Sequence, residues 1–415
     1  MRKLSLFLTL LAATSLVNLR NGPLHFLLWL PKLLATALSP LLALASGLLA
    51  LVGLRRRDWL LVGLGMGGTA VSLRHFLAIA TPRHADMSVA FGPEWQKRLP
   101  PQIATRFSAR PWQPLVYGEP RGQVWRNVRY GYNPDAGVPL YADILSPPAG
   151  VTPSGLGIIF IHGGAWRFGR RNISKFPYFR QLAGQGHLIM DIDYTLNPLG
   201  TIPGMVRDVK RAIIWLKAHA TEYNIDPERI ALLGQSAGGH LALLAAYTPN
   251  YVGWQPKNVA GDTSVRAVVS FYGPPDMIAL HDDMVARFGS VLTDDVLEQV
   301  NGLLSRVRED TLVPVISDLV GEPLAERPDI YRLLSPSTYV DAGCPPTLLL
   351  YGTHDVFVDH LSAERLYKSL RQANVPVVYL PLPGCEHTFE SVLPRVSPAA
   401  QTAVYHLERF LALMV

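Results

Sequence analysis

The first 83 residues contain long apolar runs with few charges between them. Residues 33–54 are 22 positions without a charged side chain, and as a helix they would be about 33 Å long, enough to cross a bilayer core. The runs 4–19 and 59–73 are shorter, and the latter extends to residue 80 only by including Arg74 and His75. Three such runs predict a membrane region over residues 1–83 with two or three transmembrane helices, rather than buried helices of a soluble protein.

The first run also has the basic start and apolar middle of a signal peptide. The residues around Asn18 contain no convincing small-x-small cleavage site, and further apolar runs follow. We therefore expect this run to remain in the protein as part of an anchor.

The pattern changes after the apolar region. Residues 84–123 contain six prolines and scattered aromatic side chains without a clean period, which predicts a linker or an arm packed on the next domain. From 124 to 415, short β-type runs alternate with helical stretches, which predicts an α/β fold with a mostly parallel eight-stranded sheet and helices on both faces. The expected strands are 124–130, 140–145, 156–161, 187–192, 230–233, 265–272, 347–351 and 375–380, and the expected helices lie near 174–185, 204–222, 238–247, 361–373 and 397–413.

Residues 276–334 interrupt this alternation. The segment is helix-like and richer in acidic side chains, so it is interpreted as an insertion after a strand. Two interpretations stay open: a small helical cap over the active site, or a peripheral decoration of the domain.

The net charge is +6 and the pI is near 9.3, which by themselves would suggest nucleic acid or an anionic membrane surface as a partner. The charge is unevenly distributed, because residues 1–83 carry nine Lys or Arg and one acid, whereas residues 84–415 carry 29 Lys or Arg and 31 acids. The larger part is thus nearly neutral, with no basic excess for nucleic acid, and the positive charge flanks the apolar runs.

These flanking charges also bear on orientation. Arg55, Arg56 and Arg57, together with Arg2 and Lys3, favour the cytoplasmic side, and three spans would then place residues 84 onward outside. The opposite ends of the runs carry Arg20, Lys32, Arg74 and Arg83, and with two spans the large domain would stay inside. We expect a multi-pass membrane protein whose catalytic domain is extracytoplasmic. If the anchor is only a tether, removing residues 1–83 should release a soluble hydrolase.

A candidate nucleophile lies between an apolar strand and an apolar helix. Gly234-Gln235-Ser236-Ala237-Gly238 is a G-x-S-x-G pattern, and a serine on such a tight turn exposes Oγ beside the positive end of the following helix. Upstream, a strand ends in His162-Gly163-Gly164-Ala165-Trp166, where consecutive glycines allow backbone N–H groups to approach a developing oxyanion. An ordinary glycine-rich turn is the alternative for this second segment.

A serine nucleophile needs a base, and the base needs an orienting partner. Asp355 follows one predicted strand and His387 follows the next, which gives the order Ser, Asp, His at the carboxyl ends of strands. Asp359 and His360 are local competitors, but they lie further along, where the next helix begins.

Residues 124–413 resemble an α/β hydrolase of the esterase/lipase group, similar to its hormone-sensitive-lipase-like and feruloyl-esterase-like branches. The matching motifs are HGGAW at 162–166, DYTLNP at 193–198, GQSAGGH at 234–240, GTHD at 352–355 and EHTF at 386–389. The resemblance implies Ser236 as nucleophile, Asp355 as orienter and His387 as general base and acid. It also implies an oxyanion hole from the N–H groups of Ala237 and of residues 163–165, with Gly163 and Gly164 as the main candidates.

Two segments depart from the family pattern. Many relatives have a third glycine where this chain has Ala165, whose N–H remains a usable donor if its φ is negative. The family's DYRLAPE-type segment is here DYTLNPLG, without the arginine and the acid, so the support of the site can differ. His162 and His240 sit beside motifs, and we expect them to hold loops rather than react.

The remaining residues suggest no metal or cofactor. Two cysteines exclude a disulfide-rich scaffold and a four-cysteine zinc site, and no H-E-x-x-H pattern occurs. Cys344 and Cys385 fall at opposite ends of neighbouring parallel strands, about 15–20 Å apart, which is too far for a disulfide.

The sequence therefore predicts a membrane-anchored serine carboxylic ester hydrolase that acts through an acyl-enzyme on a small-molecule or lipid ester. Its expected partners are this substrate and the membrane, without nucleic acid, and its oligomeric state is open. Two alternatives remain: an acyltransferase that uses the same triad, and a catalytically silent membrane scaffold with a hydrolase fold.

Overall fold

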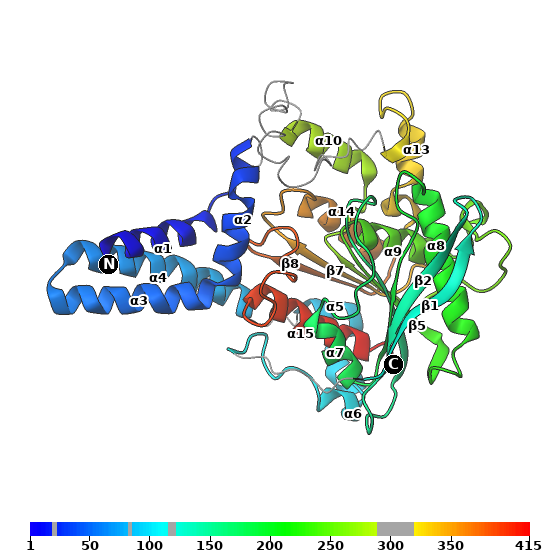
Figure 1. Cartoon of the computed structure of the whole chain (residues 1–415), viewed down its shortest axis with the longest axis horizontal. Coiled ribbons are helices and arrows are strands. Elements are labelled where there is room, and N and C mark those ends of the chain that lie inside the picture. The colour runs from blue at the N-terminus through cyan, green and yellow to red at the C-terminus, as the bar shows by residue number, and fades with distance from the viewer. Residues whose placement is uncertain (19–22, 82–84, 115–121, 289–318) are drawn as a thin grey trace.

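The computed structural model describes residues 1–415 except 19–22, 82–84, 115–121 and 289–318. It consists of an α/β domain and a bundle of N-terminal helices that projects from one side of this domain (Figure 1). The family fold predicted from the sequence is present, and the N-terminal helices differ in one break from the expected pattern.

The domain is built on an eight-stranded sheet with the order β1-β2-β4-β3-β5-β6-β7-β8. β2 pairs antiparallel with β1 and β4, and all other neighbours are parallel. The central strands are buried on both faces, which explains why they are continuous apolar runs in the sequence. The strands are β1 (Val124–Asn133), β2 (Val138–Leu145), β3 (Gly155–Ile161), β4 (Leu188–Ile192), β5 (Ile225–Gln235), β6 (Ala267–Phe271), β7 (Thr347–Gly352) and β8 (Val377–Leu382).

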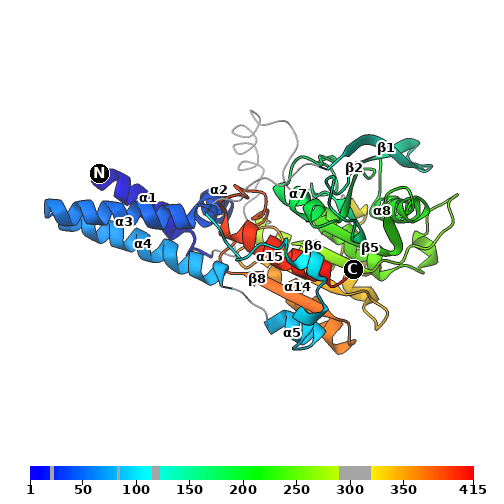
Figure 2. The same ribbon diagram turned by 90° about the horizontal axis from the view of Figure 1, so that it is seen from below.

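Helices cover both faces of this sheet (Figure 2). α8 packs on α9 and both contact β5, while α7 lies beside α15, to which it is joined by the hydrogen bond from Gln181 to Glu408. The helices after the strands are α7 (Pro177–Gly184), α8 (Ile202–Ala218), α9 (Ala237–Tyr247), α14 (His360–Gln372) and α15 (Pro398–Ala412). Of the expected insertion, the structure describes α10 (Met277–Phe288) and α13 (Pro328–Leu333), and residues 289–318 lie outside the described part.

Three N-terminal helices run side by side and a fourth crosses their base. α1 (Arg2–Thr14), α3 (Ser39–Arg56) and α4 (Trp59–Ala80) form the projection, and α2 (Pro23–Ala37) lies between them and the domain (Figure 1). The prediction of one helix over 33–54 is wrong, because the chain breaks at Leu38 between α2 and α3. Pro40 is the reason: it lacks an N–H and its ring clashes with the preceding turn, so it is accepted in the first turn of a new helix.

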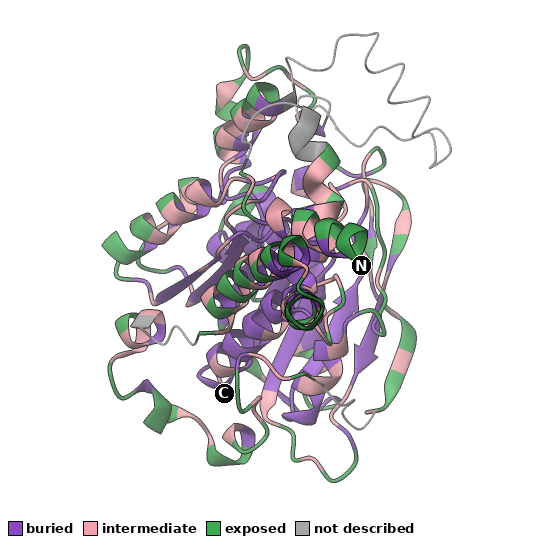
Figure 3. Ribbon diagram, turned by 90° about the vertical axis from the view of Figure 1, so that its left-hand side faces the viewer, coloured by how far each residue is buried: buried purple, intermediate pink, exposed green. Residues whose placement is uncertain are grey.

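α3 and α4 have 18 and 22 residues and are long and apolar enough to cross a membrane, by length and composition. They pack closely, since a Cβ at Gly65 would lie 2.6 Å from the carbonyl oxygen of Ser46. α1 has 13 residues, about 20 Å of helix, which is short of the bilayer core. The projection carries many exposed apolar side chains, in contrast to the buried strands behind it (Figure 3); among them are Phe7, Leu10, Leu44, Leu48, Leu51, Leu60 and Met66.

The described part of residues 84–123 packs against the domain as an arm that contains α5 (Ala85–Phe91), a short 3-10 turn (Trp95–Arg98) and α6 (Pro101–Ala104). Trp112 donates through Nε1 to the carbonyl oxygen of Val396 at 2.8 Å. The N–H of Ser108 donates to Glu408 Oε1 at 2.7 Å, and Glu408 Oε2 accepts from Gln181 at 2.8 Å. Glu408 is fully buried, and it joins the arm to two helices of the domain.

Burial raises the pKa of Glu408 to about 7, so the folded protein binds this proton more tightly than the unfolded chain. Its contribution to stability is complete below about pH 4.5 and is lost as the pH rises to about 7, a change of about 3 kcal/mol. We expect Glu408→Gln to flatten the pH dependence of the free energy of unfolding over this range. Denaturation at several pH values checks this, and equal slopes for both proteins would contradict it.

Candidate active site

Ser236 occupies the sharp turn between β5 and α9. Its φ is 51°, and its N–H donates to the carbonyl oxygen of Phe271 in β6 at 2.9 Å. A Cβ at Gly238 would lie 2.1 Å from the carbonyl oxygen of Ile161 in β3, so only glycine fits there. The turn is therefore wedged between two neighbouring strands, and its strain is sustained by the surrounding sheet.

The structure brings the three predicted catalytic residues together. His387 Nε2 lies 3.0 Å from Ser236 Oγ, and His387 Nδ1 lies 2.7 Å from Asp355 Oδ2. Asp355 follows β7 and His387 follows β8, and both side chains are buried whereas Ser236 is partly exposed. With Asp355 ionised, Nδ1 carries the proton and the lone pair of Nε2 faces the serine hydroxyl, which is the arrangement a general base requires.

The loop after β7 holds Asp355 through its own backbone. Asp355 Oδ1 accepts hydrogen bonds from the N–H groups of Phe357 and Val358, at 2.8 and 2.9 Å. The competitors have other functions: Asp359 caps α14 by accepting from the N–H of Leu361 at 3.1 Å, and it lies 3.3 Å from His360 Nδ1. The geometry thus favours Asp355 and His387 over this second pair.

The candidate oxyanion donors lie beside the nucleophile. A Cβ at Gly163 would be 3.1 Å from the Cβ of Ser236, so the glycine segment passes directly next to the serine. Ala237 is the first residue of α9, and the N–H groups of a first helical turn have no intrahelical acceptor. Ala165 has a φ of 49°, so the condition of a negative φ is not met, and Gly163, Gly164 and Ala237 remain the candidate donors.

A buried carboxyl group that sequence reasoning missed lies next to the triad. Glu390 Oε1 accepts from the hydroxyl of Tyr272 and from Gln235 Nε2, the latter at 2.6 Å. The ring of Tyr272 lies 4.3 Å from the imidazole of His387, between centroids. Burial raises the pKa of Glu390. The cluster supports the turn residue Gln235 and the base from one side, and nothing in the sequence marked Glu390 beyond its position three residues after His387.

Two buried cations were also missed as parts of the site. Arg287, at the end of α10, donates through Nη1 to the carbonyl oxygens of Asp355 and Val356 at 2.9 and 2.8 Å. Lys32 in α2 forms a buried ion pair with Glu386, the residue before His387. Lys32 was counted above as a charge flanking the membrane runs, and this is wrong. A lone lysine among apolar residues is costly without a partner, which is the signal that marks it.

The other motif residues support loops, as expected. His240 Nε2 bonds to the carbonyl oxygen of Leu334 at 2.8 Å, and burial lowers the pKa of His240 to about 4. His162 Nδ1 bonds to the carbonyl oxygen of Gly163 at 2.9 Å and its ring stacks on Tyr194. In the DYTLNPLG segment, Asp193 forms an ion pair with Arg171, which also contacts Asp143. These residues position the oxyanion segment and do not face the serine hydroxyl.

Neither cysteines nor a metal cluster contribute to the site. Cys344 and Cys385 are free and buried. Within the described ranges, no group of three or more His, Cys, Asp or Glu side chains is arranged to hold a metal ion.

The fold and this Ser–His–Asp geometry define the class of α/β-hydrolase proteins with an esterase-like site. A family model, BD-FAE, matches residues 142–370, and the chain belongs to this family. It is similar to the "Probable carboxylic ester hydrolase LipM" of Mycobacterium tuberculosis (strain ATCC 25618 / H37Rv), with 36% identity over 61% of this chain and 53% of that protein. It is also similar to "Esterase LipC" of the same organism, with 32% identity over 70% of this chain and 67% of that protein.

The chain thus spans about half of LipM and about two thirds of LipC. Among solved structures, Thermogutta terrifontis esterase 2 phosphorylated by paraoxon is similar with a TM-score of 0.50 and 22% identity, covering 69% of this chain and 92% of that chain. This likeness establishes the fold, which is that of the α/β-hydrolase esterases.

The role of Asp355 can be tested with Asp355→Asn. The amide would donate to His387 Nδ1 and so favour the tautomer whose Nε2 carries the proton, which cannot accept the serine proton. We expect kcat for a p-nitrophenyl ester to fall by about a thousandfold or more with the fold intact. Asp359→Asn is the matched control, because asparagine also caps helices, and it should keep kcat within about threefold. The reverse ranking of these two variants would assign the orienting role to Asp359.

Proposed function

We propose that this protein is a membrane-anchored serine carboxylic ester hydrolase of the esterase/lipase type that works through an acyl-enzyme. The observation that carries the proposal is the continuous chain of contacts from Asp355 through His387 to Ser236 Oγ, at 2.7 and 3.0 Å. The names of LipM and LipC as ester hydrolases agree with it. Membership of an esterase family supports hydrolysis over a silent scaffold, because a scaffold has no need of a complete triad.

The geometry leads to the following steps. His387 Nε2 removes the proton of Ser236 as Oγ attacks the ester carbonyl, and Asp355 stabilises the resulting imidazolium. The N–H groups of Gly163, Gly164 and Ala237 bind the oxygen that becomes negative. His387 then protonates the leaving alcohol, and water, activated by the same imidazole, releases the acid from the acyl-enzyme.

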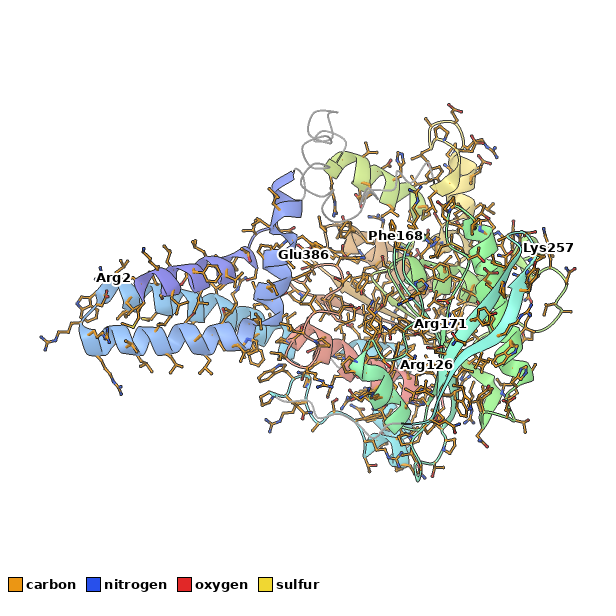
Figure 4. The ribbon with its side chains drawn as sticks, viewed as in Figure 1. Arg2, Arg126, Phe168, Arg171, Lys257 and Glu386 are labelled. Carbon is orange, nitrogen blue, oxygen red and sulfur yellow. The ribbon has the colours of Figure 1, made fainter. Side chains whose placement is uncertain are left out.

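The projecting helices support membrane anchoring. α3 and α4 are long enough to span, and their outer faces are apolar. Arg2 at the start of α1 contacts Asp58 at 2.8 Å, so it lies at the far tip of the bundle together with the α3–α4 connection (Figure 4). Arg55, Arg56 and Arg57 belong to this same tip. By the positive-inside rule, the tip faces the cytoplasm and the catalytic domain lies outside.

A domain held at a bilayer surface meets esters dissolved in water and esters of lipids alike. The proposed substrate is therefore a small-molecule or lipid ester, and the membrane is the second partner. An ester panel with increasing acyl chain length would separate these two substrate types.

Ser236→Ala tests the nucleophile directly. The variant lacks the attacking oxygen, so hydrolysis of short p-nitrophenyl esters should fall by about a thousandfold or more while the protein stays folded. A fluorescent fluorophosphonate should label the wild type and not the variant. Absence of labelling on well-folded wild-type protein, or full activity of the variant, would eliminate the proposed mechanism.

The membrane side can be tested by protease protection. We expect protease added to sealed right-side-out vesicles to digest residues 84–415 and to leave this part intact in inverted vesicles. Detergent-opened vesicles are the control, because they expose the domain in both cases. Protection in right-side-out vesicles only would place the catalytic domain in the cytoplasm.

A further inference from the structure

The helix α2 of the N-terminal region reaches the catalytic loops of the domain. Lys32 Nζ forms an ion pair with Glu386 Oε1, and the side chains are exposed by only 1% and 0%. The two residues are 354 positions apart in the sequence. Glu386 lies beside α2, where the bundle meets the domain (Figure 4). This buried charge pair is thus formed by the anchor region and the segment that carries His387.

The carboxylate of Glu386 also joins the two catalytic loops to each other. Its second oxygen, Oε2, accepts the N–H of Val356 at 3.0 Å. Val356 follows Asp355, and Glu386 precedes His387, so one side chain connects the neighbours of the orienting acid and the base. Arg287 holds the same peptide segment from its carbonyl side. The position of the Asp355–His387 pair therefore depends on where the carboxylate of Glu386 is held.

An aromatic contact runs parallel to the ion pair. Trp29, one turn before Lys32 on α2, meets the ring of Phe357 edge to face with centroids 5.6 Å apart. The ring of Phe357 in turn lies 5.2 Å from the imidazole of His387 at an angle of 70°. α2 consequently touches the surroundings of the base at two points, through a charge and through an aromatic wall.

Neither charged group is favourable in this place by itself. A buried carboxylate without compensation is costly, and so is an ammonium group on an apolar helix, so each is retained only with the other. Without Lys32, the Glu386 carboxylate would be drawn toward solvent or other donors, and its bond to Val356 would be weakened. The Asp355 loop and His387 would then be held less firmly at the distances that proton transfer requires.

We propose that Lys32 is a positioning residue of the active site, which makes α2 a part of the catalytic unit. The proposal rests on the proposed hydrolase function. It also replaces the expectation that residues 1–83 are only a tether whose removal releases a working hydrolase, since that truncation removes the partner of Glu386. Because Leu38 alone separates α2 from the putatively separate membrane helix α3 in sequence, seating of the anchor and geometry of the site are linked.

The test uses the full-length protein in detergent and counts competent sites by the end point of fluorophosphonate labelling. We expect Lys32→Met to lower kcat per labelled site by about tenfold or more, with KM changed by less than about threefold, because chemistry rather than ester binding is impaired. Lys32→Arg keeps the charge and should retain most of kcat. Lys97→Met is the matched control, since Lys97 is an exposed lysine whose ion pair with Glu94 lies on the surface of the arm.

A double variant, Lys32→Met with Glu386→Gln, removes both charges and keeps an oxygen that can accept the N–H of Val356. We expect it to recover kcat per site at least about threefold over Lys32→Met, while remaining below the wild type. Should Lys32→Met not fold, the double variant decides by itself: a kcat per site clearly below the wild type supports the proposal.

A wild-type kcat per labelled site in Lys32→Met, or in the double variant when the single one does not fold, would overturn it and leave the pair a purely structural role. Failure of the proposed function looks different, because wild-type Ser236 would then not be labelled at all.

Discussion

The left-handed turn at Ser236 is the constraint on which the site depends. A serine with a φ of 51° is unfavourable in isolation, and it persists because the turn is fixed between β3 and β6. Glycine at 238 lets the backbone pass the carbonyl of Ile161, and the buried parallel strands leave no room for relaxation. The hydroxyl is thereby presented at the carboxyl edge of the sheet, where the loops after β7 and β8 bring the acid and the base.

Those two loops are held largely by buried charges and hydrogen bonds. Arg287 binds the carbonyls next to Asp355, Glu386 binds the N–H of Val356, and Glu390 binds Gln235 and Tyr272. In a medium of low dielectric constant such interactions are strong when matched and costly when broken. The partners come from different parts of the chain, since Arg287 belongs to the insertion and Lys32, the partner of Glu386, to the anchor region. The active site is therefore the place where three parts of the protein meet.

The N-terminal region combines two tasks that its composition does not separate. Its projecting helices expose apolar faces and carry the positive charge at their tip, as expected of a membrane anchor. Its α2 helix instead uses a lysine and a tryptophan to contact the domain. The net charge of +6 thus contains one lysine that serves the catalytic domain and not the membrane surface.

The sequence by itself determined the sheet, the nucleophile and the order of the triad. These features are local: buried parallel strands are short apolar runs, and the turn at Ser236 requires small neighbours at fixed spacing. Only the tertiary structure decided the break at Leu38, the positive φ of Ala165, and the contacts of Arg287 and Lys32. The physical reason is that a periodic pattern reports whether a residue is buried, whereas the partner of a buried charge 354 positions away depends on how whole helices dock.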